Sequence, residues 1–483
     1  MDNLYKIALE VVKTLQSRGY QAYFAGGCVR DRLMNRVPQD YDVATNARPN
    51  EVIKLFPKTL AIGKAFGVII VRLPVKLQPT IPGSNSLHSN CQSMVLAPIQ
   101  RKPGKSAESV AIEVTTFRTE GAYSDGRRPD SVKFTRRDDD VARRDFTING
   151  LLYDPIKREL VDLVNGKKDI RAKVIKTIGD PAKRFNEDRL RMLRAIRFAC
   201  QLGFKIEPKT KSAIKKLARR IKGISAERIR EELKKTIISP LRAEGIEMLR
   251  ESGLLKEILP EVLKMRGVKQ PVQFHPEGDV YVHTLKVLKH LRKPSFDLAL
   301  TALLHDIGKP GTFMITDRIR FHEHERVGAE MAERICRRLK LSNAQIETIT
   351  WIISKHLVFK DIDKMRVSTL KKLFIHPAYP GLNELHRADR LASDMDLKPY
   401  HKAVRLYKKY SKEELKPKPL VNGYDLIKLK LKPGPIFSEL LHKVEEAQLE
   451  NSVRTKTQAL ALVKRLIHSL TAKCAKNAKN KSV

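Results

Sequence analysis

Two aspartates separated by a single residue, Asp40 and Asp42, are the first side chains whose spacing suggests chemistry. Side chains alternate between the faces of an extended strand, so both carboxylates would project from one side while Tyr41 turns away. Carboxylates this close repel each other unless one is protonated or a cation lies between them. Mg²⁺ favours few carboxylates together with substrate phosphate oxygens. The pair therefore predicts a Mg²⁺ site, with a solvated pair of strand-edge charges as the alternative.

Gly26 and Gly27, which precede the aspartates, predict a phosphate-binding turn. They follow the strand-like run QAYFA and lead into Arg30 and Asp31. Glycine lets the backbone approach a polyanion closely, and the amide N–H groups at a helix start would face it. Together with the metal site, this turn predicts a nucleoside triphosphate held by backbone amides and metal ions.

The elements that position these residues are expected to be a helix and several strands. Residues 1–20 carry an apolar stripe typical of a helix that packs on something. A buried strand is expected at 68–71 and another at 110–116. In the second of these, Glu113 is out of phase with its apolar neighbours, so it would face the same site as the aspartates. A third carboxylate suits two-metal nucleotidyl transfer. An ordinary polar-face residue is the alternative.

The motif RRDFTIN, which begins at Arg143, predicts the start of a helix with Asp145 near its positive end. Asp145 and Asn149 are four residues apart and would share one helix face. A purely structural capping role for Asp145 is the competing interpretation, and both roles can hold. The preceding residues 121–141 are rich in Gly, Asp and Arg and predict a mobile loop.

A helix over residues 185–198 combines a buried apolar stripe with a charged face. The charged members are Glu187, Asp188, Arg191, Arg194 and Arg197. Arginines at every third position, with no acid between them, predict a bound anion alongside; a solvated basic face is the alternative.

Asp188 and Arg191 have the chemistry to choose a base. A carboxylate accepts from an exocyclic amine, whereas a guanidinium donates to ring acceptors. Cytosine and adenine carry such an amine, but uracil and guanine present a carbonyl oxygen there. The two side chains would therefore select C and A without a nucleic-acid template.

The net charge of +40 over 483 residues predicts a polyanionic partner, and nucleic acid is favoured over an anionic membrane. A basic surface without a partner is the alternative. No apolar run approaches the roughly 20 residues needed to span a bilayer, and the N-terminus lacks a signal-peptide pattern. The five cysteines are scattered and lack metal-like spacing, which predicts a reducing cytoplasm.

Histidines and aspartates between about residues 270 and 400 predict a second metal site. Neutral imidazoles and carboxylates from different helices can converge on one or two metals. The candidates are His283, His305, Asp306, His322, His324, His356 and Asp389.

The stretch GGCVRDRLMNRVPQDYDVAT resembles the signature of the tRNA nucleotidyltransferase and bacterial poly(A) polymerase superfamily, in its eubacterial and eukaryotic class. The resemblance implies an α+β fold. A polymerase beta-like nucleotidyltransferase head with a small mixed or antiparallel sheet would be followed by an all-α neck, HD body and tail. The expected boundaries are a head at 1–150 with an insertion at about 74–109, a base-recognition and neck region at 151–265, an HD domain at 266–410, and a helical tail at 411–483 with a basic, disordered C-terminus.

The resemblance also assigns roles. It implies that Asp40, Asp42 and Glu113 are catalytic, with Mg²⁺ on the two aspartates. The implied nucleotide-binding residues are Gly26, Gly27, Arg30, Arg144, Asp145, Asn149, Glu187, Asp188, Arg191, Arg194 and Arg197. The order of the later histidines and aspartates resembles the HD superfamily of metal phosphohydrolases, and selects His324 rather than His322 as a ligand. That resemblance implies phosphodiesterase or phosphatase activity on RNA 3′ ends, with Mn²⁺, Ni²⁺ or another transition metal.

The expected function is template-independent addition of CCA to tRNA from CTP and ATP. A poly(A) polymerase shares every head motif, but such enzymes of this family usually lack the complete HD ligand set. An enzyme that adds only CC or only A is a second alternative; the intact loop at 121–141 argues against CC alone. A third is an HD phosphohydrolase with an RNA-binding head, which the retained pair Asp40 and Asp42 disfavours.

Overall fold

The computed structural model describes residues 3–74, 109–121, 131–271, 273, 278–410 and 412–479. Within it the chain forms two compact units, Met1–Leu233 with Met248–Ile258, and Lys234–Glu247 with Leu259–Val483. Nearly all of the expected insertion, and residues 122–130 of the expected mobile loop, lie outside the described residues. The division into four domains stays a prediction.

A seven-stranded sheet is the centre of the first unit. Its order is β3-β4-β5-β2-β1-β8-β9, and only β2 and β5 pair in parallel, so the sheet is mixed as predicted. Its strands are β1 (Ala22–Ala25), β2 (Asp42–Thr45), β3 (Thr59–Gly63), β4 (Val68–Pro74), β5 (Ser109–Thr116), β8 (Leu152–Asp154) and β9 (Glu159–Val161). Smaller two-stranded pieces are β6 (Arg118–Glu120) with β7 (Val132–Phe134), and β10 (Val174–Ile175) with β11 (Lys205–Ile206).

Helix α1 (Asn3–Ser17) packs on β1, β2 and β5. Its buried residues are Ile7, Ala8, Val11, Val12 and Leu15, which recur at helical spacing and form the predicted stripe. The other helices of this unit are α2 (Gly27–Leu33), α3 (Pro49–Leu55), η1 (Lys64–Phe66), α4 (Arg137–Ala142), η2 (Thr147–Asn149), α5 (Gly166–Ala172), α6 (Pro181–Glu187), α7 (Arg191–Leu202), α8 (Pro208–Leu217), η3 (Ala218–Gly223) and α11 (Leu254–Ile258). Helices α9 (Ala226–Ile237) and α10 (Arg242–Glu251) contribute to both units.

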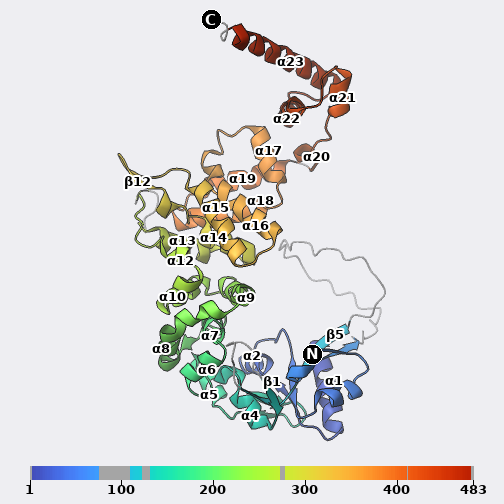
Figure 1. The fold of residues 1–483 in the computed structure, drawn as a ribbon, viewed down its shortest axis with the longest axis vertical. Coiled ribbons are helices and arrows are strands. Elements are labelled where there is room, and N and C mark those ends of the chain that lie inside the picture. The colour runs from blue at the N-terminus through green and yellow to red at the C-terminus, as the bar shows by residue number, and fades with distance from the viewer. Residues whose placement is uncertain are drawn as a thin grey trace, which may run out of the picture. The chain divides into compact units, whose positions relative to one another are not determined.

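Among its described residues, the second unit is helical apart from one short hairpin and an isolated bridge between Lys269 and Asp279 (Figure 1). The hairpin consists of β12 (Phe313–Ile315) and β13 (Ile319–Phe321). The helices are α12 (Pro260–Leu263), α13 (Val280–His290), α14 (Phe296–Leu304), η4 (Lys309–Gly311), α15 (His324–Arg338), α16 (Asn343–Lys355), η5 (Val358–Asp361), α17 (Val367–Ile375), α18 (Tyr379–Ala392), α19 (Lys398–Lys409), α20 (Lys412–Leu415), α21 (Gly423–Lys428), α22 (Pro435–Leu449) and α23 (Lys456–Lys479).

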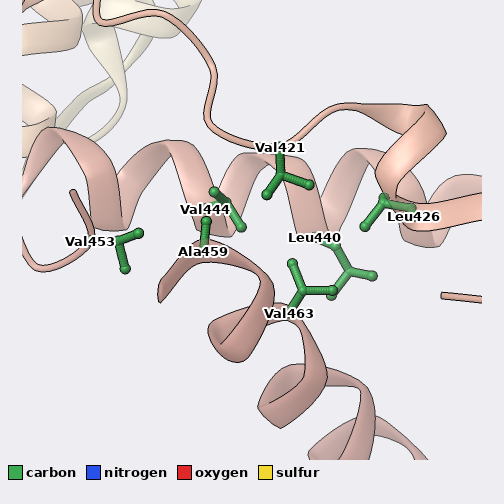
Figure 2. Close-up of a cluster of buried hydrophobic side chains, with 7 residues drawn as sticks. All are labelled: Val421, Leu426, Leu440, Val444, Val453, Ala459 and Val463. Atoms are coloured by element: carbon green, nitrogen blue, oxygen red, sulfur yellow. The ribbon is translucent and has the colours of Figure 1, made fainter. Parts of the chain in front are cut away.

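The tail helices share a small apolar core of their own. Figure 2 shows the side chains that α21, α22 and α23 and the segments beside them turn toward one another: Val421, Leu426, Leu440, Val444, Val453, Ala459 and Val463. Helix α22 begins at Pro435, since proline suits the first turn of a helix.

Four expectations about local structure are wrong. The helix expected over residues 185–198 is interrupted, because α6 ends at Glu187 and α7 begins at Arg191. The described part of the loop expected at 121–141 contains β7 and most of α4. Helix α23 runs to Lys479, so most of the C-terminus predicted to be disordered is helical; its alanines and lysines have high helix propensity. The motif RRDFTIN does not begin an α-helix, because α4 ends at Ala142 and only the three-residue η2 follows. No helix among the described residues is long and apolar enough to cross a membrane.

Candidate active site and metal centre

Three carboxylates meet where β2 and β5 run in parallel. Asp42 is the first residue of β2 and is paired in register with Glu113 on β5, while Asp40 lies two residues before it. Burial and then the charges of Glu113 and Asp40 raise the pKa of Asp42 to about 7, against the opposing effect of Arg144. Tyr41 is 5% exposed, and its ring packs against those of Tyr5 and Phe24. The crowded negative charge is the environment that a divalent cation relieves.

The glycine turn lies beside these carboxylates. Gly26 has a left-handed φ of 72° and precedes α2, which begins at Gly27. A Cβ at Gly26 would approach a guanidinium nitrogen of Arg144 to 3.3 Å, in a backbone conformation that disfavours side chains. On α2, Arg30 is 8% exposed and donates from Nη1 to Oδ1 of Asn149 at 2.7 Å. The glycine turn and α2 therefore contact the RRDFTIN segment, through Arg144 and Asn149.

These segments enclose a cavity of about 910 Å³. Its lining residues are Gly26, Gly27, Arg30, Asp40, Asp42, Ile62, Phe66, Arg118, Arg143, Arg144, Asp145, Asn149, Asp188, Arg191, Arg194, Arg197 and Phe198. Arginine is the commonest residue type among them, so the cavity suits an anionic ligand next to the carboxylates. This volume lies within the range of known small-molecule sites.

Asp145 organises the floor of the cavity. Its Oδ2 accepts from Nε and Nη2 of Arg194 at 2.8 and 2.5 Å, and its Oδ1 accepts from Nδ2 of Asn149 at 3.1 Å. Burial acts to raise the pKa of Asp145, but the Arg194 charge and the Asn149 hydrogen bond lower it to about 2. The carboxylate therefore stabilises the fold as well as shaping the site.

We expect Asp145→Asn to lower the free energy of unfolding by about 2 kcal/mol at pH 7. Because the folded pKa of about 2 lies below the ordinary value of 3.8, this stabilisation is complete above pH 3.8 and is lost as the pH falls toward 2. Urea unfolding of both proteins at pH 7 and pH 3 measures it. A difference in stability that is equal at the two pH values would contradict this explanation.

The sequence predicted that the arginines of α7 lack acidic partners, but each of them is paired with an acid. Arg191 pairs with Glu187 at 2.8 Å, just before the helix. Arg194 pairs with Asp145 at 2.5 Å. Arg197 pairs with Glu232 of α9 at 2.7 Å. The acids come from other segments, so the ladder alone does not require an anion.

Asp188 and Arg191 both line the cavity. Asp188 lies 3.3 Å from the guanidinium of Arg228 on α9. Arg191 donates from Nη1 to the carbonyl oxygen of Arg184 and to Glu187, and from Nη2 to the carbonyl oxygen of Arg143, at 2.8–3.1 Å. A guanidinium has five N–H donors, so these three bonds leave two N–H groups of Arg191 for another partner.

The predicted HD residues form two groups. Within each group, the candidate ligand atoms all lie within 4.8 Å of one another. The first group is His283, His305 and Asp389, and the second is Asp306, His324 and His356. Nε2 of His283 lies 2.9 Å from Oδ1 of Asp389, and Nε2 of His324 lies 3.3 Å from Nε2 of His356.

Asp306 connects the two groups. Its Oδ2 lies 3.3 Å from Nε2 of His305, and its Oδ1 lies 3.5 Å from His324 and 3.7 Å from His356. Although burial acts to raise the pKa of Asp306, His305 and Lys309 lower it well below its ordinary value. A carboxylate with one oxygen toward each group can bridge two cations.

Three of the histidines have a fixed orientation. Nδ1 of His305, His324 and His356 lies 2.9, 2.9 and 2.6 Å from the carbonyl oxygen three residues earlier. A carbonyl oxygen only accepts, so each Nδ1 carries the proton and each Nε2 offers a lone pair. Nε2 of His305 is buried and has no hydrogen-bond partner among the described residues. This donor set therefore fits a metal ion.

Gly308 allows this arrangement to close. A Cβ at Gly308 would overlap the carbonyl oxygen of His324 and crowd the backbone of Gly328, so only glycine lets the turn after Asp306 touch α15. We expect Gly308→Ala to weaken metal binding at this centre by about tenfold or more, since it separates Asp306 from His324. Metal titration followed by elemental analysis measures this. Gly311→Ala is the matched control, because a Cβ there meets open space.

A second cavity, of about 390 Å³, opens onto this centre. It is lined by Pro271, His305, Asp306, Lys309, Arg318, Ile319, Arg320, Phe321, His322, His324, His356, Leu357, Lys360, His386, Asp389, Arg390, Ser393 and Asp394. His322 lies on this wall but belongs to neither metal group, in line with the preference for His324.

Known families match most of the head, neck and HD region. The poly A polymerase head domain matches residues 22–78 and 87–176, the probable RNA and SrmB-binding site of polymerase A matches 203–265, and the HD domain matches 280–397. By these three matches, the segments concerned resemble the tRNA nucleotidyltransferase and poly(A) polymerase family.

Curated relatives of this nucleotidyltransferase family are CCA-adding enzymes. The chain is 38% identical to that of Anoxybacillus flavithermus over 263 residues, which is 54% of this chain and 57% of the relative. It is 40% identical to that of a Geobacillus species over 255 residues, or 53% of this chain and 54% of the relative. The chain therefore spans little more than half the length of the curated relatives it matches.

Solved structures of the family extend the likeness in fold. A Bacillus stearothermophilus CCA-adding enzyme in complex with CTP superimposes with a TM-score of 0.71 at 26% identity, covering 98% of this chain and 100% of that one. A Thermotoga maritima CCA-adding enzyme complexed with tRNA has a TM-score of 0.55 at 18% identity, covering 96% and 95%, and shows the fold alone.

The structure brings most of the residues predicted for a nucleotidyltransferase to one cavity, and leaves two beside it. Glu113 flanks Asp42 without lining the cavity, and Glu187 holds Arg184 and Arg191 instead. Sequence reasoning missed Arg118, Arg143, Ile62, Phe66 and Phe198. Arg143 adjoins the predicted Arg144, so the doubled arginine was a usable signal. Phe198 was not singled out in the sequence, although Arg30, Arg194 and Arg197 lie 4.0–5.5 Å from its ring.

Proposed function

We propose that this protein is a template-independent tRNA nucleotidyltransferase that adds CCA to tRNA 3′ ends from CTP and ATP. One observation carries the proposal. A single cavity gathers the glycine turn, the aspartate pair, the RRDFTIN segment and the two residues with the chemistry to select C and A. The family matches and the CCA-adding relatives support the same reaction.

The head is proposed to hold Mg²⁺ on Asp40 and Asp42, with Glu113 as the third carboxylate. The raised pKa of Asp42 supports this fit, because the same crowding that favours a proton favours a cation. Bound Mg²⁺ would supply activation of the tRNA 3′-hydroxyl and neutralisation of the departing pyrophosphate.

The side chains around this metal site are proposed to hold the nucleotide. Arg30 and Arg144 bind the triphosphate as the turn at Gly26 and Gly27 lets the backbone approach it. Asn149 and Asp145 position the ribose from the RRDFTIN segment. Because Arg30 and Asn149 are already hydrogen-bonded to each other, the triphosphate and ribose contacts are coupled.

Asp188 is proposed to accept from the exocyclic amine of cytosine or adenine, while the two remaining donors of Arg191 reach ring acceptors. In the Asp188→Asn variant, we expect the rate of addition from UTP or GTP, relative to that from CTP and ATP, to rise by about tenfold or more. The reason is that a carboxamide can donate a hydrogen bond as well as accept one. Primer extension with each nucleoside triphosphate measures the ratios. A uniform loss with all four would contradict a role in base selection.

The tRNA is proposed to contact the neck, where the RNA-binding family match covers residues 203–265. Helices α8 and η3 carry closely spaced lysines and arginines, of which Lys215, Lys216 and Arg219 are exposed or half-exposed. Phosphate contacts of this kind read the shape of an RNA stem.

The decisive experiment offers CTP and ATP with three RNAs: tRNA lacking CCA, tRNA ending in CC, and a poly(A) primer. We expect CCA on the first, a single A on the second and no extension of the third. Long A tails would identify a poly(A) polymerase. Addition to the second tRNA alone would identify an A-adding enzyme.

The bridged pair of metal groups favours a second function, an HD phosphohydrolase that acts on RNA 3′ ends. Mn²⁺ and Ni²⁺ are the proposed metals because most of the ligands are imidazoles. Bound metal would supply a nucleophilic hydroxide and charge neutralisation. Hydrolysis of an RNA 2′,3′-cyclic phosphate that survives His305→Ala with Asp306→Ala would contradict this function. The complete ligand set also favours CCA addition over poly(A) synthesis.

The proposed location is the cytoplasm. The described cysteines Cys28, Cys200 and Cys336 are buried. Burial raises the pKa of Cys28 and Cys336 to about 12, so neither is a reactive thiolate at neutral pH.

A further inference from the structure

His386 of α18 is a buried imidazole that neither metal group uses. It is 4% exposed, and its Nε2 is buried without a hydrogen-bond partner among the described residues. Its ring lies 5.3 Å from that of Phe359. A buried polar nitrogen without a partner is destabilising unless a ligand satisfies it.

The position of His386 connects it with the HD centre. It lies three residues before Asp389 on α18, a spacing that places the two side chains on neighbouring parts of one helix face. Both line the cavity of about 390 Å³. His386 therefore contacts the space next to the metal ligands without being one of them.

The other walls of the cavity indicate which part of a substrate His386 would meet. Phosphate oxygens already have cationic partners there: Lys309, Arg318, Arg320, Lys360 and Arg390. Arg318 and Lys360 have no acidic partner among the described residues, so their charges are available to an anion. The group that remains for the imidazole is a polar part of the substrate other than its phosphate.

A hydroxyl is the group that suits a neutral imidazole best. Neutral histidine offers one donor and one acceptor, and a hydroxyl can satisfy either. Burial, opposed by Asp389 and reinforced by Arg390, lowers the pKa of His386 to about 4, so both functions persist at neutral pH. In an RNA 3′-phosphate, the 2′-hydroxyl is the hydroxyl next to the reacting phosphate.

We propose that His386 hydrogen-bonds the ribose 2′-hydroxyl of an RNA 3′-phosphate end in the HD cavity and so selects ribonucleotides over deoxyribonucleotides. The inference rests on the phosphohydrolase function proposed above. His386 is on this view a specificity-determining residue, whereas Asp306 and the metal-binding histidines perform the hydrolysis.

The test compares adenosine 3′-phosphate with 2′-deoxyadenosine 3′-phosphate as substrates of the Mn²⁺-loaded, full-length protein. We expect the wild type to prefer the ribonucleotide by about tenfold in kcat/KM, the size of one well-formed hydrogen bond. His386→Phe should remove the preference by slowing only the ribonucleotide. His386→Gln, which keeps a donor and an acceptor, should restore part of it.

Two controls separate this role from a structural one. Metal content by elemental analysis should be the same in all variants, because His386 belongs to neither metal group; a loss of metal in His386→Phe would overturn the proposal. His401→Phe, an exposed histidine on α19 outside the cavity, should behave as the wild type. An equal fall in kcat/KM for both substrates in His386→Phe, or an unchanged preference for the ribonucleotide, would also overturn the proposal.

The hydrolase function and the role of His386 can fail separately. A wild type that hydrolyses neither nucleotide contradicts the hydrolase, and isothermal titration with the same two nucleotides then decides the role of His386. A ribonucleotide preference in binding that disappears in His386→Phe would support the role. Equal binding of both nucleotides by the wild type would overturn it.

Discussion

Asp42→Asn is expected to slow nucleotide addition by roughly a thousandfold with CTP and with ATP, about 4 kcal/mol of transition-state stabilisation. Asp42 lies between Asp40 and Glu113, so it is the carboxylate most exposed to their negative charge. The amide keeps the shape of the side chain but removes one of the charges that hold Mg²⁺. Single-turnover addition to tRNA at saturating nucleotide measures the loss.

A surface carboxylate of the same unit provides the control for Asp42. Asp138 of α4 is 66% exposed at its side chain, and Asp138→Asn should leave addition unchanged within about twofold. Loss of CTP addition without loss of ATP addition in Asp42→Asn would contradict the metal assignment, because the metal site is shared by both nucleotides. Recovery at high Mg²⁺ would support it.

Asp306→Asn is expected to weaken metal binding at the HD centre by about a hundredfold or more and to remove its hydrolytic activity. Asp306 has one carboxylate oxygen toward each metal group, so both groups lose a ligand together. It also accepts from Nζ of buried Lys309 at 2.7 Å, a charge that would lose its partner. Elemental analysis after dialysis measures the metal.

The variant His283→Ala separates the two metal groups. His283 belongs only to the first group, so this change should remove less metal than Asp306→Asn. Equal metal loss in the two variants would show that the groups do not bind independently. Full metal retention in Asp306→Asn would contradict the bridging role.

The sequence predicted features that depend on local periodicity. The apolar stripe of α1, the strand that carries Glu113 and the single-sided placement of Asp40 and Asp42 follow from the repeats of helices and strands. The histidines of the HD region were identifiable because they recur in a known order. The metal groups then formed from those same residues.

Contacts between distant segments were not predictable in the same way. The arginine ladder of α7 was expected to need an anion, yet Arg194 finds Asp145, 49 residues earlier, and Arg197 finds Glu232, 35 residues later. Spacing along a helix reveals which side chains share a face but not which acids another segment supplies. His386 escaped notice for the same reason, because its burial becomes visible only when Phe359 packs against it.

The hydrogen bonds from Nδ1 of His305, His324 and His356 have a consequence for how the HD centre acquires its metal. Each ring is held by a carbonyl oxygen of its own helix end or turn, so its tautomer and direction need no help from the ion. The ligands are therefore preorganised, and loading requires little rearrangement. Chelation should strip the metal while leaving the helical fold intact, unlike in small zinc domains that unfold when the metal is removed.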